Sequence, residues 1–276
     1  MRVGRCCFVA AAIAVSSCVF AAEGERRQGS DSSSTLPAVW TVSAGVETRF
    51  EPTYAGSKHH LLWPYPLFDV RRAGTPEHFL SPRDGLGFPI LDSDKFEVGP
   101  VAQFKWPRKE GRYRELRGLG DTQFAPEVGG FVNYWWTPWL RTRTELRQGI
   151  SGHRGLVSDL TGDLVVPVGA QLTLSGGPRI TLASADASTR YFEVTPARSA
   201  SSGLPIYHAS GGIYSLGLGT QLRQRWSPAF ATHAFVEYEK LMEGVAHSPL
   251  ISQRGSSTQL TLGVGVTRAF DIVQFW

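Results

Sequence analysis

Alternation with a period of two residues runs through residues 137–151 of this chain. One parity carries Leu140, Thr142, Thr144 and Leu146, and the other carries Arg141, Arg143, Glu145 and Arg147, as expected if the segment is a β-strand. Neither face resembles an ordinary core or an ordinary solvated surface, because one holds only Leu and Thr and the other is densely charged. Such a strand separates two different solvents.

The same alternation recurs in about twelve segments, many of them close to ten residues long and separated by Pro, Gly, Ser and Asn. After the N-terminal residues, no run approaches the roughly 20 consecutive apolar residues of a membrane helix. Short alternating segments bounded by turn residues are typical of strands that cross a membrane. The pattern therefore predicts an all-β fold, a closed antiparallel transmembrane β-barrel of about twelve strands occupying residues 37–276.

A soluble β-sandwich would also alternate, and two features favour the barrel over it. Aromatic residues gather beside expected turns, as in a membrane-interface girdle. These residues are Tyr134, Trp135, Trp136 and Trp139 around Thr137 and Pro138, Trp226 before Ser227, Trp63 before Pro64, and Trp106 before Pro107. The polar faces also carry small and charged residues in every segment, which suits a wet lumen.

In a membrane barrel, the charged side chains of these strands would face the lumen and the apolar side chains would face lipid. Odd-numbered residues from Glu127 to Arg179 are expected to face inward, which requires odd-length hairpin loops at residues 137–138 and around residues 167–169. An ion pair of Arg141 with Asp163, or of Arg143 with Asp159, would fit such an inner wall. The lumenal polar candidates are Arg141, Arg143, Glu145, Arg147, Asp159, Asp163 and Arg179.

The N-terminus has the layout of an export signal. Arg2 and Arg5 precede an apolar run, and small residues near Ala21 offer a cleavage site, so residues 1–21 are expected to be a signal peptide. Cleavage near Cys18 with lipidation is the alternative. Residues 22–36 are polar and Ser-rich and are expected to form a flexible periplasmic lead-in. All three cysteines lie inside the signal, so we expect neither a disulfide nor thiol chemistry in the mature protein.

Several long motifs give the chain a family resemblance from about residue 40 to residue 270. They include GLGDTQFAPEVGGF, RDGLGFPILDSDKFEVGP, RQGISGHRGLVSDL, and YFEVTPARSASSGLPIYHASGG followed by HSPLISQRGSSTQLTLGVGVTRAF. These motifs resemble the MipA/OmpV family of Gram-negative outer-membrane proteins. The resemblance implies an outer-membrane barrel, and for the founding member a scaffold joining a lytic transglycosylase to a penicillin-binding protein. Other members are described as adhesins or antigens.

The chain end departs from that family pattern. Arg268 stands where the family has Tyr in its terminal insertion signal, and either Phe270 or Trp276 could supply the terminal aromatic residue.

Chemical motifs are weak throughout the chain. Residues 149–153 (GISGH) miss the Gly-x-Ser-x-Gly elbow at the fifth position and lie between strands, whereas the elbow needs a strand followed by a helix. The histidines show no metal-ligand spacing, and the Asp92–Asp94 stretch is interpreted as a solvated turn. The pI near 9.1 is not accompanied by a nucleic-acid motif. We therefore expect no enzyme activity, no cofactor and no metal.

Two functional classes follow from these observations. The first is a structural or interaction protein of the envelope, with outer-membrane lipid around it and murein enzymes as partners. The second is a pore, or a ligand-binding or adhesin barrel, because about twelve strands can leave either a narrow channel or a filled interior. The sequence leaves the state of the lumen, the ligand and the oligomeric state open.

Overall fold

The computed structural model describes residues 39–75 and 77–273. The predicted signal peptide and lead-in, and the alternative terminal signal at Trp276, lie outside these residues. The chain forms a 12-stranded antiparallel sheet, which confirms the predicted fold class. The strands are β1 (Val39–Pro52), β2 (His60–Arg72), β3 (Leu86–Gly87), β4 (Leu91–Asp92), β5 (Phe96–Lys105), β6 (Ala125–Thr137), β7 (Leu140–Gly149), β8 (Leu156–Val168), β9 (Leu172–Ala183), β10 (Gly212–Ser227), β11 (Phe230–Leu241) and β12 (Thr258–Val273).

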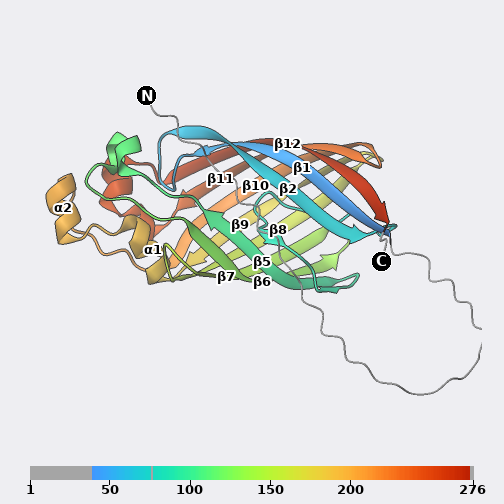
Figure 1. Ribbon diagram of the computed structural model, residues 1–276, viewed down its shortest axis with the longest axis horizontal. Coiled ribbons are helices and arrows are strands. Elements are labelled where there is room, and N and C mark those ends of the chain that lie inside the picture. The colour runs from blue at the N-terminus through green and yellow to red at the C-terminus, as the bar shows by residue number, and fades with distance from the viewer. Residues whose placement is uncertain (1–38, 76, 274–276) are drawn as a thin grey trace, which may run out of the picture. The chain divides into compact units, whose positions relative to one another are not determined.

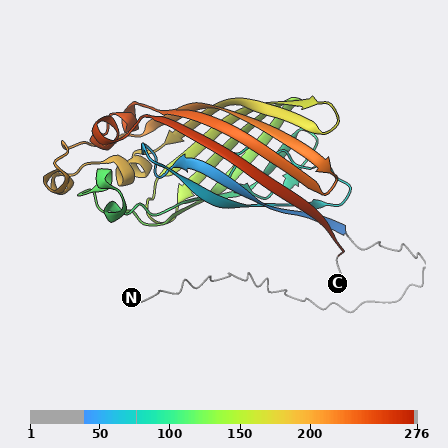
Figure 2. The same cartoon turned by 90° about the horizontal axis from the view of Figure 1, so that it is seen from above.

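The sheet curls into a nearly closed barrel (Figures 1 and 2). Neighbouring strands follow the order β2-β1-β12-β11-β10-β9-β8-β7-β6-β5-β3, so the first and last long strands pair with each other. The wall is made of ten long strands, whereas β3 and β4 have two residues each and both pair with β5. Strands β2 and β3 form the two ends of the sheet and leave a seam between them.

The two ends of the barrel differ in the length of their connections. Residues 138–139, 169–171 and 228–229 make tight turns at the end where β1 starts and β12 finishes. Bacterial barrels place short turns on the periplasmic side and long loops outside the cell. We therefore assign the end with the tight turns to the periplasm.

The long extracellular loops contain helices, which the strand pattern did not predict. These helices are η1 (Glu110–Arg112), η2 (Arg114–Leu116), α1 (Ala185–Phe192), α2 (Pro196–Ser202), α3 (Glu243–Ala246) and η3 (Leu250–Arg254). Apolar residues of these loops, together with Leu241 at the end of β11, form a buried cluster that caps the extracellular mouth: Leu116, Leu119, Phe192, Val194, Leu204, Ala209, Leu241, Val245, Leu250 and Ile251. Among the described residues, none of the helices is long and apolar enough to cross a membrane.

Burial along the wall confirms the predicted parity. The odd-numbered residues Glu127, Asn133 and Arg147 are buried, whereas the even-numbered residues Val128 and Leu146 are exposed on the outer face. The expectation of an odd-length turn between β6 and β7 is wrong, because this turn has two residues. A register shift between Trp135 and Thr137 adds one residue on β6 and restores the parity. A shift between Arg225 and Ser227 does the same before the β10–β11 turn.

Most of the predicted girdle lies where the interface requires it. Trp136, Trp139, Trp226 and Trp106 are exposed on the outer surface near strand ends. The interpretation of Trp63 and Pro64 as a turn is wrong, since both lie inside β2. Proline is tolerated in β2 because this strand is at one end of the sheet, where one side of the backbone has no strand to pair with.

A candidate site in the barrel lumen

Residues 73–75 and 77–85, which we call the plug, follow the periplasmic end of β2 and precede β3, and their inner end lies in the barrel. Backbone and side chains at its inner end, Ser81 to Gly85, contact strands on several sides of the lumen. The contacts are dominated by charge, because the wall strands present arginines and carboxylates inward. The plug is therefore held by ion pairs and hydrogen bonds.

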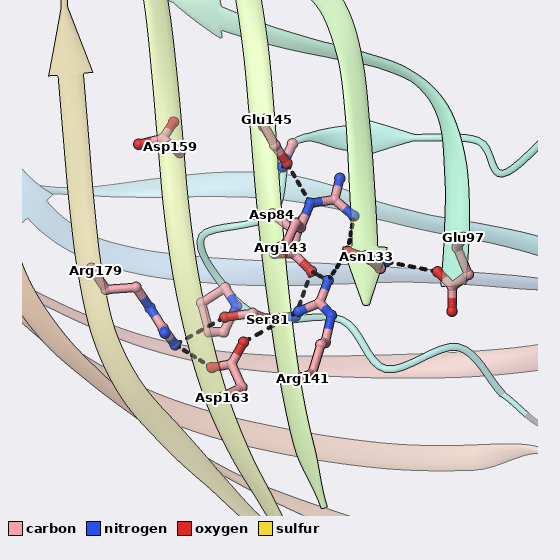
Figure 3. A network of polar contacts seen from close by, with 12 residues as sticks. Ser81, Asp84, Glu97, Asn133, Arg141, Arg143, Glu145, Asp159, Asp163 and Arg179 are labelled. Atoms are coloured by element: carbon pink, nitrogen blue, oxygen red, sulfur yellow. Dashed lines mark hydrogen bonds and ion pairs between the residues drawn. The ribbon is translucent and has the colours of Figure 1, made fainter. Parts of the chain in front are cut away.

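Asp84 joins the plug to two arginines of β7 (Figure 3). Its carboxylate lies 2.7 Å from Arg141 Nη2 and 3.6 Å from Arg143 Nε. Arg141 also pairs with Asp163 on β8 at 3.2 Å, which is one of the two ion pairs predicted from the sequence. Asn133 on β6 accepts hydrogen bonds from both arginines, at 2.9 and 3.1 Å. The two guanidinium groups are almost fully buried, and these shared carboxylate and amide partners compensate their positive charges.

The alternative pairing of Arg143 with Asp159 is wrong. The register places Arg143 opposite Thr161 and Glu145 opposite Asp159, two residues away from what that pair requires. Arg143 instead donates to Glu145 at 2.6 Å, and its guanidinium lies 3.9 Å from the centre of the Phe131 ring. Asp159 pairs with Arg147 at 2.5 Å.

Arg83 connects the plug to the opposite wall. Its guanidinium lies 2.8 Å from Glu237 and 2.9 Å from Glu239, both on β11. It also reaches Asp159 on β8 at 3.3 Å. One plug residue therefore bridges strands on two sides of the lumen.

Three further bonds hold the ends of this segment. Arg179 on β9 donates to Ser81 Oγ at 3.1 Å and pairs with Asp163 at 2.7 Å. Arg49 on β1 donates to the carbonyl oxygen of Pro82 at 3.0 Å, and the backbone N–H of Gly85 donates to Glu145 at 2.9 Å. At the inner end of the plug, residues 81–85 thus contact five wall strands (β1, β7, β8, β9 and β11). All seven lumenal candidates are buried inside the barrel.

The plug divides the remaining lumenal space. A cavity of ≈ 100 Å³ on the periplasmic side is lined by plug residues Ser81, Pro82 and Asp84 together with β1, β2, β10 and β11. A second cavity, of ≈ 300 Å³, lies on the extracellular side against Arg83 and below the cap. The inner end of the plug therefore lies between these two cavities of the lumen.

In the GISGH motif, residues 149–153, the serine and the histidine do not hydrogen-bond to each other. Ser151 Oγ donates to the carbonyl oxygen of Phe124 at 3.1 Å, whereas His153 is buried against Glu127 at 3.0 Å. Glu127 also binds Lys105 at 2.9 Å and Arg147 at 3.1 Å. His153 thus belongs to the same charged wall as the lumenal arginines.

His78 on the plug lies near the periplasmic mouth. It contacts Asp69 on β2 at 3.2 Å and Asp92 on β4 at 3.3 Å, and Glu97 is close enough to join them around a cation. The hydrogen bond to Asp69 is the main cause that raises the pKa of His78 to about 9, against the opposing effect of burial. At neutral pH this raised pKa favours the imidazolium form, which pairs with the two aspartates.

A nearly closed antiparallel sheet with aliphatic and aromatic side chains outside and charges inside defines an outer-membrane β-barrel. The chain belongs to the MltA-interacting protein (MipA) family, whose family model matches residues 44–270. This match confirms the resemblance of the sequence motifs.

Three solved outer-membrane proteins are similar to this chain at low sequence identity. The outer membrane channel from Pseudomonas putida F1 is 12% identical, with 89% of this chain and 100% of that chain covered and a TM-score of 0.42. The NanC porin is 13% identical, with 83% and 98% covered and a TM-score of 0.38. The CymD monoaromatic hydrocarbon channel is 10% identical, with 86% and 90% covered and a TM-score of 0.35. No curated protein matches the sequence.

Proposed function

We propose that this protein is a non-enzymatic outer-membrane scaffold that holds murein-remodelling enzymes at the periplasmic face of the membrane. The observation that carries the proposal is the plug. A passive pore needs a continuous aqueous path, whereas here residues Ser81 to Gly85 are bonded to five wall strands at the middle of the lumen.

The cap adds a second obstruction. Nine of its ten buried apolar residues come from three extracellular loops, the tenth is Leu241 at the end of β11, and together they pack over the outer mouth. A solute would have to displace both a hydrophobic cluster and an ion-pair network to cross. An occluded barrel is well suited to act as an anchor, because its wall is stiff and its interior is not needed for transport.

The family name supports a murein enzyme as partner, since the matched family is that of an MltA-interacting protein. A lytic transglycosylase and a penicillin-binding protein are the partners we propose. The tight periplasmic turns are too small to supply the roughly 800 Å² per partner of a standard interface. The lead-in, residues 22–36, would then contribute the remaining surface by ordering on binding.

The test is capture of murein enzymes from a solubilised envelope by the full chain in lipid nanodiscs. Deleting residues 24–35 should reduce the captured transglycosylase and penicillin-binding protein several-fold. Reversing the exposed charge of Lys95 in the periplasmic β4–β5 turn (Lys95→Glu) should weaken capture further. Arg114→Glu, an equal charge reversal in the extracellular η2 helix, is the matched control and should capture as the natural chain does.

Heat-dependent migration on gels verifies that every variant is folded. If the full-length natural chain captures neither enzyme, the scaffold proposal is wrong and a transport role becomes the better explanation of the polar lumen.

A further inference from the structure

The seam between β2 and β3 is an interruption of the barrel wall. Among the described residues, β2 pairs only with β1, and β3 and β4 pair only with β5. Each unpaired backbone N–H or C=O group costs several kcal/mol in hydrocarbon. An open seam in a membrane wall must therefore contain features that lower this cost.

Prolines remove part of this cost. Phe88 and Ile90 donate their N–H groups toward β5, to Pro100 (3.1 Å) and Val98 (2.9 Å), so the nitrogen of residue 89 between them faces the seam. Pro89 has no N–H to leave unpaired there. On the other side, Pro64 and Pro66 occupy alternate positions of the end strand β2, where proline fits only with its nitrogen on the unpaired side. Proline therefore removes an unpaired donor at three positions along the seam.

An apolar groove of ≈ 440 Å³ lies in the seam. Phe68 and Val70 of β2 form one side of the groove, and Leu86, Phe88 and Pro89 form the other. Pro100 and Val101 of β5 lie beside them. This volume is within the 300–1,000 Å³ range of ligand sites, and the groove lies in a wall that faces lipid. Gly99 permits its shape, because a Cβ there would be 1.9 Å from the carbonyl oxygen of Phe88.

The groove continues into the lumen. Phe68, Asp69, Leu86 and Gly87 line both the groove and the periplasmic cavity beside the plug. Contacts across the seam close it above and below. Toward the extracellular end, Trp63 stacks on Trp106 with 6.2 Å between the ring centres. Toward the periplasm, His78 contacts both Asp69 and Asp92.

Arg72 supplies a charge at the end of the groove. Phe68, Val70 and Arg72 share one parity of β2, so the arginine follows the two groove residues along the outer face and ends the strand at the periplasmic interface. Arg72 is exposed, and the described residues place no carboxylate within ion-pair distance of it. A cation at this depth suits the phosphate of an anionic lipid.

We propose that the seam is a binding site for one anionic phospholipid of the periplasmic leaflet. One acyl chain lies between Phe68 and Phe88 with its tip toward the lumenal cavity, and the phosphate contacts Arg72. The site accounts for the apolar lining of the groove and for the charge that stands directly beyond it.

The experiment uses the full chain in nanodiscs of phosphatidylcholine and phosphatidylglycerol, followed by native mass spectrometry of the protein with its retained lipid. The natural chain should retain one phosphatidylglycerol. Val70→Trp, which fills the groove, should lower retention at least five-fold. Val264→Trp on the outer face of β12, away from the seam, is the matched control and should retain the lipid.

Arg72→Gln should abolish the preference for phosphatidylglycerol over phosphatidylcholine, and Arg72→Lys should restore it. A photoactivatable acyl chain should crosslink to β2 and to residues 86–101. Retention unchanged by Val70→Trp, or crosslinks spread evenly around the barrel, would overturn the proposal and leave only annular lipid.

Discussion

Replacing Arg83 by methionine removes the only cation that the described residues place within ion-pair distance of Glu237 and Glu239. Asp159 keeps Arg147 as a partner, so two carboxylates lose their compensation. Removing one member of a buried ion pair typically costs about 3–5 kcal/mol. Side-chain exposures of 18% for Arg83, 9% for Glu237 and 20% for Glu239 admit some water, so we expect the lower end, about 3 kcal/mol.

The assay is urea unfolding of the protein from liposomes, followed by gel mobility and tryptophan fluorescence. Arg114→Met, at an exposed residue of the extracellular helix η2, is the control and should change the free energy of unfolding by less than about 0.5 kcal/mol. Adding Glu237→Gln and Glu239→Gln to Arg83→Met should recover most of the loss, because the freed charges are then gone. A loss for Arg83→Met no larger than the control would refute the ion-paired plug.

Three other predictions test the wall and the periplasmic mouth. Leu218 is 63% exposed near the middle of β10, and Leu218→Arg should lower the free energy of unfolding by about 2–4 kcal/mol in the same assay. Gln221→Arg, on the lumenal face of the same strand, should lower it much less. Equal losses would argue against a membrane wall. A lipid-soluble relaxant should reach a spin label at Leu174 and not one at Ser175, and the reverse order would contradict the parity. Because the pKa of His78 is raised to about 9, its protonated form stabilises the fold fully below pH ~6.5, and this contribution disappears as the pH rises through about 9. His78→Gln should therefore be less stable than the natural chain at pH 6 and nearly equal to it above pH 9.5, and a difference that does not change with pH would exclude the imidazolium contact.

The faces of the wall strands could be predicted because side chains alternate with a period of two whatever the register. Arg141, Glu145 and Arg147 had to share one face once the segment was a strand. Their partners depend on the register between strands, which is why one predicted ion pair is present and the other is shifted by two residues.

The plug could not be predicted from periodicity. Residues 81–85 (SPRDG) have no repeating pattern, and their partners lie on strands distant in sequence, such as Glu237, 154 positions from Arg83. The only local signal is the pair Arg83 and Asp84 between two apolar stretches, which is also typical of a solvated turn. Closure of the barrel is what brings these charges together.

Helix α2 did carry a local signal that the strand interpretation passed over. Thr195 accepts a hydrogen bond from the backbone N–H of Arg198, Pro196 occupies the first turn, and Gly203 ends the helix with φ 74°. This order of Thr, Pro and Gly is typical of a short helix.

The occluded lumen is tested most directly by single-channel recording of the natural chain in planar phospholipid bilayers. Insertion is verified by heat-dependent gel mobility of protein recovered from the same lipid. The plug held by Arg83 and Asp84, together with the extracellular cap, predicts a folded, inserted protein that shows no stable conductance steps. Long-lived steps of the size produced by an open barrel of this strand number would contradict it.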